Sequence, residues 1–267
     1  MKSPFLPALL LGMFFLVSCR NNSDNSSPTA GINYKTASLE RQSGPGCATE
    51  EGACARIEMA YPLAEGADQA LVSRINDSIQ TTLSQVLFML NPEGDSLKTL
   101  DQQADQFVTS YTDFLKEVPD YEMGWWIEAS HEVHLNNSKI TSLELMVSSF
   151  TGGAHPIGFS ESFNFFLPGG EPVLLDSLIS DRTAFLQLVE KEFKLSNGLP
   201  ETAVLQDEGY FYGEAFTLPI NFVFTSEGLY LIYNVYEAAP YAMGPTEFLI
   251  PFDKLKDLLR LERILEN

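Results

Sequence analysis

The chain has 267 residues, of which 45% are hydrophobic and 19% charged, and its formal net charge is −20. This length is enough for one large or two small domains with a packed core. The negative charge argues against binding to nucleic acid or to anionic lipid, because both repel an acidic protein, and it is compatible with a basic partner or with high solubility.

The start of the chain has the pattern of a bacterial lipoprotein signal. Residues 5–17 are apolar but too few to span a bilayer as a stop-transfer helix, and the sequence LVSC that ends at Cys19 matches a lipobox. We expect a signal peptide at residues 1–18 and lipidation of Cys19, with an ordinary signal peptide or an anchor helix as the alternative. Residues 19–31 are rich in Asn and Ser and are expected to form a flexible tether. The predicted location is the cell envelope, lipid-anchored in a membrane such as the outer membrane and facing the periplasm or the surface.

Two further cysteines, Cys47 and Cys54, lie close together among glycines. In an oxidising compartment we expect them to form a disulfide. Closing so short a loop stabilises a fold by roughly 2–3 kcal/mol on the chain-entropy estimate. A redox or metal site is the alternative, but the spacing is not C-x-x-C and no histidine lies nearby.

The first half of the chain predicts two strands followed by two helices. Alternating apolar and polar side chains indicate strands at residues 32–42 and 55–61, with Pro62 ending the second. Apolar side chains at helical spacing then indicate a helix from about residue 66 to residue 90 and another from about residue 97 to residue 118.

The next region predicts a hairpin of two long strands, at residues 125–135 and 140–150. A glycine-rich segment leads from the hairpin to another strand at residues 160–167. A helix is expected at residues 181–195, because Asp181 is a suitable N-cap and apolar residues follow at helical spacing. A short helix is expected at residues 200–205.

The end of the chain predicts a second hairpin. Side chains alternate along a strand at residues 218–224, and one face of it carries Leu218, Ile220, Phe222 and Phe224. A turn with Gly228 at positive φ leads to a strand at residues 229–236. That strand is apolar or aromatic on both faces, so we expect it in the middle of its sheet. A loop, a short strand and a helix complete the chain.

Strands and helices come in blocks rather than in strict alternation. This order predicts an α+β fold with mostly antiparallel sheets, packed helices and two closely associated units. We place the units at residues 32–150 and 151–267.

Two segments resemble a known family. Residues 221–255 read NFVFTSEGLYLIYNVYEAAPYAMGPTEFLIPFDKL, and residues 148–179 read SSFTGGAHPIGFSESFNFFLPGGEPVLLDSLI. Both resemble the DUF3298 family, whose members follow a companion unit named DUF4163. The resemblance implies a DUF4163-like unit at residues 32–150 and a DUF3298-like unit at residues 151–267.

This pairing of units occurs in bacterial lipoproteins, in the extracytoplasmic part of a lysozyme-sensing anti-sigma factor, and beside some polysaccharide deacetylase domains. The deacetylase relatives carry catalysis in a separate metal-binding domain, so the resemblance does not transfer that activity. The anti-sigma relative has a cytoplasmic segment and a membrane helix, and here a lipidation signal replaces them. The resemblance implies an extracytoplasmic module that is similar to a protein-recognising one.

Two loops supply the candidate binding residues, which are Gly152, Gly153, His155, Glu237 and Tyr241. The glycines let the backbone approach a ligand or a strand closely, and histidine is a hydrogen-bond donor or a base. A carboxylate beside tyrosine suits a sugar or a protein loop. In the structural alternative the first loop is a bulge or a tight strand crossing, Glu237 accepts backbone amides, and Tyr241 packs under the turn.

A metal site is conceivable at His131, Glu132 and His134, with His155 as a third nitrogen ligand. Histidines three positions apart on a strand point to opposite faces, so we expect no metal and no other cofactor. The sequence also lacks the G-x-S-x-G motif of serine hydrolases, and we expect no catalytic residue.

Together these features predict a non-catalytic envelope lipoprotein that binds a protein such as lysozyme, or a cell-wall glycan. An acidic surface favours the encounter with a basic partner. One alternative is a cell-wall hydrolase that uses His155 with Glu237 or a metal ion. Another is a structural protein that scaffolds the envelope.

Overall fold

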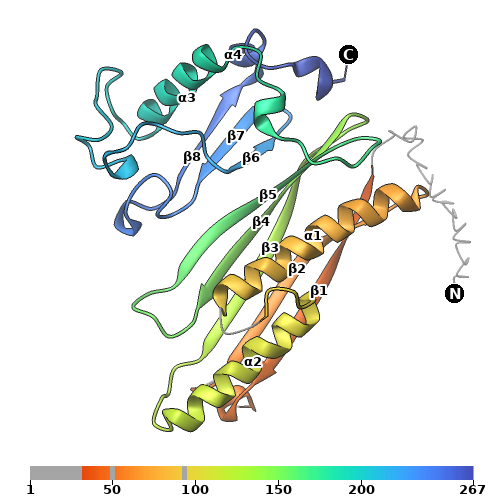
Figure 1. Cartoon of the computed structure of the whole chain (residues 1–267), viewed down its shortest axis with the longest axis vertical. Helices are drawn as coiled ribbons and strands as arrows, with labels where there is room; N and C mark the ends of the chain where they lie inside the picture. The colour runs from red at the N-terminus through yellow and green to blue at the C-terminus, as the bar shows by residue number, and fades with distance from the viewer. Residues whose placement is uncertain (1–31, 49–51, 92–94, 267) are drawn as a thin grey trace, which may run out of the picture.

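The computed structural model describes residues 32–48, 52–91 and 95–266. In these ranges a five-stranded sheet packs against a three-stranded sheet (Figure 1). The predicted signal peptide, the lipidated Cys19 and the tether at residues 19–31 lie outside the described residues. None of the helices in the described ranges has the length and hydrophobicity needed to span a bilayer.

The larger sheet has the strand order β1-β2-β3-β4-β5. Its strands are β1 (Asn33–Ser43), β2 (Ala55–Glu65), β3 (Trp125–Asn136), β4 (Ile140–Phe150) and β5 (Ile157–Phe166). Neighbours are antiparallel except β2 and β3, which are parallel because helices connect them. β5 pairs with β4 along its length, so this sheet extends past residue 151, the boundary predicted between the two units.

Two helices, α1 (Gln69–Leu90) and α2 (Leu100–Glu117), cover one face of the larger sheet (Figure 1). The side chain of Asp68 caps α1, and a capping box between Thr99 and Gln102 begins α2. The apolar faces of helices and sheet share a buried core, which includes Ile57, Ile79, Phe107, Ile127 and Leu145. The predicted helices are confirmed, with boundaries shifted by a few residues.

The smaller sheet consists of β6 (Asn221–Phe224), β7 (Gly228–Tyr233) and β8 (Thr246–Pro251), all antiparallel, with β7 in the middle as predicted. The helices α3 (Arg182–Ser196) and α4 (Phe252–Leu255) pack against it (Figure 1). The predicted cap of α3 is confirmed, since the Asp181 carboxylate accepts a hydrogen bond from the Ala184 N–H at 3.0 Å. The core of this half includes Phe185, Phe193, Phe224, Leu231 and Tyr233.

Short 3₁₀ helices lie in the connections, at Pro45–Ala48, Leu175–Ser177, Phe211–Gly213 and Tyr241–Met243, and another, Leu261–Arg263, follows α4. The first of them contains Cys47, which forms the predicted disulfide with Cys54. The disulfide closes the connection between β1 and β2. Both the disulfide and the mixed α+β class are therefore confirmed.

Polar side chains join the two sheets at the outer edge of β5. Asn234 accepts a hydrogen bond from the Ser160 N–H at 2.8 Å and donates one to the Ser160 carbonyl at 2.9 Å. Asn221 accepts from the Ser162 N–H at 2.8 Å, and the Ser162 hydroxyl accepts from the Phe222 N–H at 3.1 Å. These bonds satisfy backbone groups that an edge strand otherwise leaves unpaired.

The predicted end of one strand and one predicted helix are wrong. β2 does not end at Pro62 but continues to Glu65. Beyond Met59 it pairs with β1 alone. A strand that is paired on one side only can contain a proline, although proline has no N–H to donate. Residues 200–205 form turns instead of a helix. The bond from the Ala203 N–H to the Pro200 carbonyl closes a single turn that is not continued.

The predicted strand at residues 218–224 begins only at Asn221. The Ile220 N–H bonds to the Glu237 carboxylate at 2.8 Å instead of to a strand, and the Ile220 side chain is 80% exposed rather than buried. Gly228 is also not at positive φ. Glycine is required there by close packing, since a Cβ would lie 2.1 Å from the Ile250 carbonyl oxygen.

Candidate functional site

Three loops meet beside the junction of the two sheets and form what we call the three-loop surface. They are residues 151–156, 209–213 and 234–245. The Tyr241 ring stacks on the His155 ring, with centroids 3.7 Å apart and planes inclined by 20°. The Tyr241 hydroxyl donates a hydrogen bond to the Pro156 carbonyl at 2.8 Å. The structure thus brings the two predicted binding loops together.

The middle loop is tied to the last loop by hydrogen bonds. The Phe211 N–H donates to the Ala238 carbonyl at 2.6 Å, and the Tyr212 hydroxyl donates to the Tyr236 carbonyl at 3.1 Å. The Tyr236 N–H in turn donates to the Ala239 carbonyl at 3.1 Å, which closes a tight turn. The surface is therefore built by contacts between loops rather than by one regular element.

Three aromatic residues of this surface have a left-handed backbone. The φ angles are 55° at Phe211, 52° at Tyr212 and 68° at Tyr236. A bulky residue in this region is held at a cost of roughly 1–3 kcal/mol. Tyr212 and Tyr236 are 57% and 50% exposed, so the strained backbone presents their rings to solvent. Strain of this kind concentrates at functional sites.

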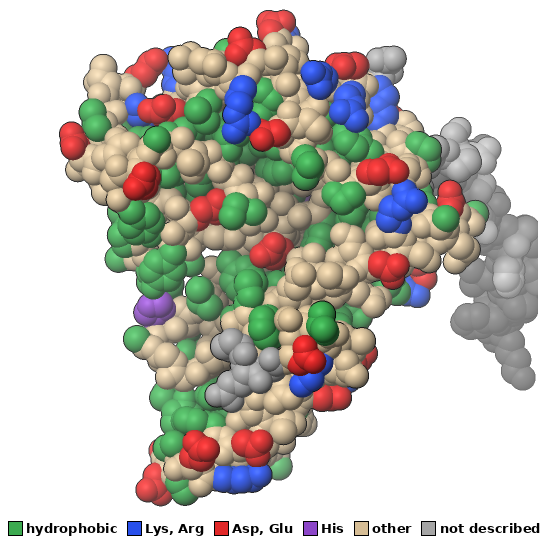
Figure 2. Space-filling view, in the orientation of Figure 1, with side chains coloured by type: hydrophobic (Ala, Val, Ile, Leu, Met, Phe, Trp, Pro, Cys, Tyr) green, Lys and Arg blue, Asp and Glu red, His purple; other side chains and the backbone are tan. Residues whose placement is uncertain are grey.

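A groove of about 650 Å³ opens next to the three-loop surface. Its apolar lining includes Met146, Phe159, Val235, Tyr241 and Met243. Figure 2 shows hydrophobic side chains gathered at the left margin, where the loops of the small sheet approach the large sheet. Glu247 also lines the groove and accepts a hydrogen bond from the Tyr230 hydroxyl at 2.6 Å. Burial and the Glu247 carboxylate raise the pKa of Tyr230, so this hydroxyl stays a donor.

A row of carboxylates, which we call the acidic strip, crosses the open face of the larger sheet. Glu40 on β1 lies opposite Glu58 on β2, which lies opposite Glu128 on β3. All three are exposed, and Glu58 forms an ion pair with Arg56 at 3.4 Å. A hollow lined by Glu58 and Glu128 shares Met146 with the apolar groove. The strip therefore continues the groove as one surface.

The two predicted glycines have different surroundings. Gly152 has φ of +86°, and a Cβ there would lie 2.6 Å from the Tyr121 hydroxyl oxygen and 3.1 Å from the Trp125 Nε1. Gly153 has no heavy atom within 4 Å of such a Cβ. Gly152 is therefore required for steric reasons, as expected if the loop is a tight strand crossing rather than a ligand-binding loop, whereas nothing in the packing requires Gly153.

Glu237 does not line the apolar groove. Its carboxylate accepts hydrogen bonds from the Ile220 N–H at 2.8 Å and from the Asn234 N–H at 2.9 Å. Burial raises the pKa of Glu237, and these two amides lower it by less. The carboxylate fixes the start of β6 and the turn after β7. This agrees with the alternative in which Glu237 accepts backbone amides instead of binding a ligand.

The three histidines have separate partners. His155 Nδ1 lies 2.9 Å from the Pro156 carbonyl, His134 Nε2 lies 2.9 Å from the Glu144 carboxylate, and His131 Nδ1 lies 3.4 Å from a backbone carbonyl of β2. The register with β4 shifts between Val133 and Leu135 on the strand that carries His131 and His134. The described residues contain no group of three or more His, Cys, Asp or Glu side chains suited to hold a metal ion.

Reasoning from the sequence missed Tyr212 and the acidic strip. The segment Gly209 to Gly213 reads GYFYG, and three aromatic residues between glycines are a local signal that an exposed loop is built there. The strip had no such signal, because its carboxylates come from three strands and meet only through strand register.

Comparisons with known proteins find a family match in each half of the chain. Residues 176–253 match the family described as a protein of unknown function, DUF3298, and residues 48–158 match the family described as deacetylase PdaC. The sequence has no significant match among curated proteins.

Two solved structures share the fold. A member of the DUF3298 family from Bacteroides fragilis superposes with a TM-score of 0.63 and 21% identity, covering 86% of this chain and 94% of that one. A DUF3298 family protein from Pseudomonas aeruginosa superposes with a TM-score of 0.58 and 19% identity, covering 88% of this chain and 98% of that one. Residues 176–253 of this chain thus match the DUF3298 family, residues 48–158 match the PdaC family, and the whole chain shares its fold with DUF3298 family proteins.

Proposed function

We propose that the protein is a non-catalytic lipoprotein of the cell envelope that binds a basic protein through the three-loop surface and the acidic strip. The observation that carries the proposal is the display of Tyr212 and Tyr236 on strained loops beside an apolar groove. Tyrosine and methionine are enriched in protein interfaces, and tyrosine is frequent among residues that dominate binding energy. The lipid anchor rests on the lipobox that ends at Cys19.

Charge supports a basic partner. The chain carries a formal charge of −20, and the acidic strip runs from Glu40 through Glu58 to Glu128, the last two of which line the hollow that adjoins the apolar groove. Such a field accelerates the encounter with a positively charged protein, and apolar contacts then hold the complex. A lysozyme-type protein has this chemistry and is the partner that we test.

The geometry favours a protein over a cell-wall glycan. Sugars bind aromatic rings by stacking on a free face, and His155 already covers one face of Tyr241. The contacts of His155 and Glu237 also give no support to a hydrolase, because Glu237 is bound to two backbone amides. The PdaC family carries the name deacetylase, and the binding proposal requires no such activity.

The test measures the binding of lysozyme to protein that carries Cys19→Ser and is therefore not lipidated. Titrations are made at about 20 mM and about 150 mM salt, because screening at the higher concentration removes most nonspecific attraction between exposed charges. Saturable binding that persists at the higher salt is expected. Loss of binding there would show attraction by charge alone and contradict the proposal, and a scaffold would then be the better hypothesis.

A variant locates the site. Tyr236→Asn removes the aromatic ring, and asparagine tolerates positive φ better than most residues. We expect affinity for lysozyme to fall about 30-fold, which corresponds to about 2 kcal/mol, with an unchanged melting temperature. Leu195→Ser is the matched control, because Leu195 is an exposed apolar residue of α3 that is not part of the three-loop surface. Equal affinity of the Tyr236 variant and the wild type would overturn the site assignment.

A further inference from the structure

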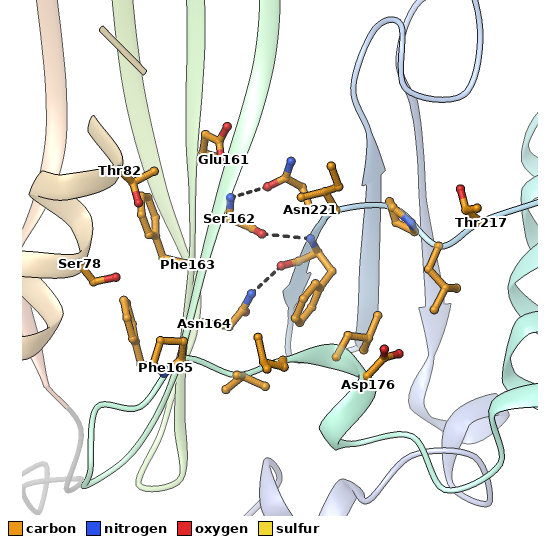
Figure 3. A pocket seen from close by; sticks show the side chains of 18 of the residues that line it. Ser78, Thr82, Glu161, Ser162, Phe163, Asn164, Phe165, Asp176, Thr217 and Asn221 are labelled. Atoms are coloured by element: carbon orange, nitrogen blue, oxygen red, sulfur yellow. Dashed lines mark hydrogen bonds between the residues drawn. The ribbon is translucent and has the colours of Figure 1, made fainter. Parts of the chain in front are cut away.

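A second groove, of about 620 Å³, lies beside the junction of the two sheets. Figure 3 shows its arrangement, with Ser78 and Thr82 on α1 at one side, Glu161 on β5, and Thr217 on the segment that leads to β6. None of these residues lines the groove of the three-loop surface. The second groove is therefore a separate cavity with its own chemistry.

Much of the polar floor of this groove is already bonded. Ser162 and Asn221 bond to each other across the junction, and Asn164 donates to the Phe222 carbonyl at 2.7 Å (dashed lines in Figure 3). At one end Asp176 forms an ion pair with Arg182. These groups hold the fold and leave no unsatisfied charge for a ligand.

Glu161 differs from its neighbours, because its carboxylate is partly buried and yet has no hydrogen bond and no ion pair among the described residues. The hydroxyls of Ser78, Thr82 and Thr217 likewise have no bonded partner in the described part of the chain, although all line the same groove. The groove thus contains one carboxylate and three hydroxyls whose acceptor positions are free.

The charge near Glu161 is uncompensated. Burial, and to a lesser degree the nearby Glu237 carboxylate, raise the pKa of Glu161. Within the described ranges Arg182 is the one Lys or Arg side chain that lines the groove, and it is paired with Asp176. The charges of the groove therefore favour a cationic ligand.

We propose that this groove binds a primary ammonium group on an apolar stem, as in a lysine side chain, with Glu161 as its counter-ion. An ammonium group has three N–H donors, and the Glu161 carboxylate accepts a charge-assisted hydrogen bond from it. Leu174 and Ile220 line the groove and are largely exposed, and they cover the methylene stem. This inference holds whether or not the three-loop surface binds a basic protein.

The experiment titrates the full chain with Nα-acetyl-lysine N-methylamide and follows binding by NMR shifts. The same compound acetylated at Nε is the neutral control, since it keeps the stem and loses the charge. We expect saturable binding of the charged probe, and at least about 10-fold weaker binding by Glu161→Gln, because a charge-assisted bond is lost. The matched variant Glu122→Gln changes an exposed glutamate elsewhere and should bind as the wild type does.

Several results would overturn the proposal. If the neutral probe bound as tightly as the charged one, the ammonium group would have no role. If Glu122→Gln weakened binding as much as Glu161→Gln does, the effect would come from the net charge of the protein alone. Tighter binding of glucosamine than of the lysine probe would contradict the apolar stem. Affinity for the lysine probe should also fall as the pH is lowered, because protonation of Glu161 competes with the cation, and Glu161→Gln should abolish that dependence.

Discussion

Gly152 and Gly153 are adjacent in the sequence, but only Gly152 faces the side chains of Tyr121 and Trp125. Gly152→Ala should destabilise the protein by about 2 kcal/mol or more, because the new methyl group meets both side chains and the backbone is left-handed. Gly153→Ala should change stability by about 0.5 kcal/mol or less, since its surroundings are open. Urea unfolding of the two variants measures the difference, and equal losses would contradict the packing of this loop.

Glu161 makes the fold less stable at neutral pH. Folding raises the pKa of Glu161 above the ordinary value of 4.5, so the folded state binds the proton more tightly than the unfolded state does. The stabilisation that comes from protonated Glu161 is therefore fully present below pH 4.5 and is lost as the pH rises through the folded-state pKa. Residues that lower stability in this way are characteristic of binding sites.

Glu161→Gln removes the charge and should raise the melting temperature at pH 7. The gain should shrink below pH 4.5, where the wild-type carboxyl is protonated as well. Calorimetry at pH 7 and at about pH 4 tests this, with Glu122→Gln as the exposed control. A lower melting temperature of the Glu161 variant at pH 7 would mean that the carboxylate has a stabilising partner.

At the scale of elements, the outer edge of β5 is closed by side chains instead of by another strand. Asn234→Ala removes the acceptor of the Ser160 N–H and the donor to the Ser160 carbonyl. We expect a loss of about 2 kcal/mol in the free energy of unfolding, from two hydrogen bonds of about 1 kcal/mol each. Asn33→Ala is the control, because Asn33 is exposed at the start of β1. If Asn234→Ala lowered the free energy of unfolding no more than the Asn33→Ala control does, the edge bonds would contribute little to stability.

Helices α1, α2 and α3 were predictable from sequence, because helical spacing and N-caps such as Asp181 are local signals. The joining of the two binding loops was not, since Tyr241 and Pro156 are 85 positions apart in the chain. The acidic strip depends on the parallel pairing of β2 with β3, which no local pattern encodes. The prediction for Ile220 was wrong, because the alternation of apolar and polar side chains predicts a strand there. In the structure the Ile220 N–H bonds to the Glu237 carboxylate instead of to a neighbouring strand.

At the scale of the whole molecule, the junction couples the two sheets into one unit. The Ser142 hydroxyl on β4 accepts a hydrogen bond from the buried Phe224 N–H on β6 at 2.8 Å and bonds to Asn164 on β5. Ile140 on β4 is also buried in the core of the second half. Neither half can therefore lose its structure without exposing groups of the other.

This coupling predicts a single thermal transition, with equal calorimetric and van't Hoff enthalpies. Ser142→Ala leaves the buried Phe224 N–H without its acceptor and should cost about 2 kcal/mol, which lowers the midpoint by roughly 6 °C in a protein of this size. The whole transition should move, because the bond lies between the halves. Two transitions, of which the substitution shifts only one, would contradict the coupling and show that the two halves of the chain unfold independently.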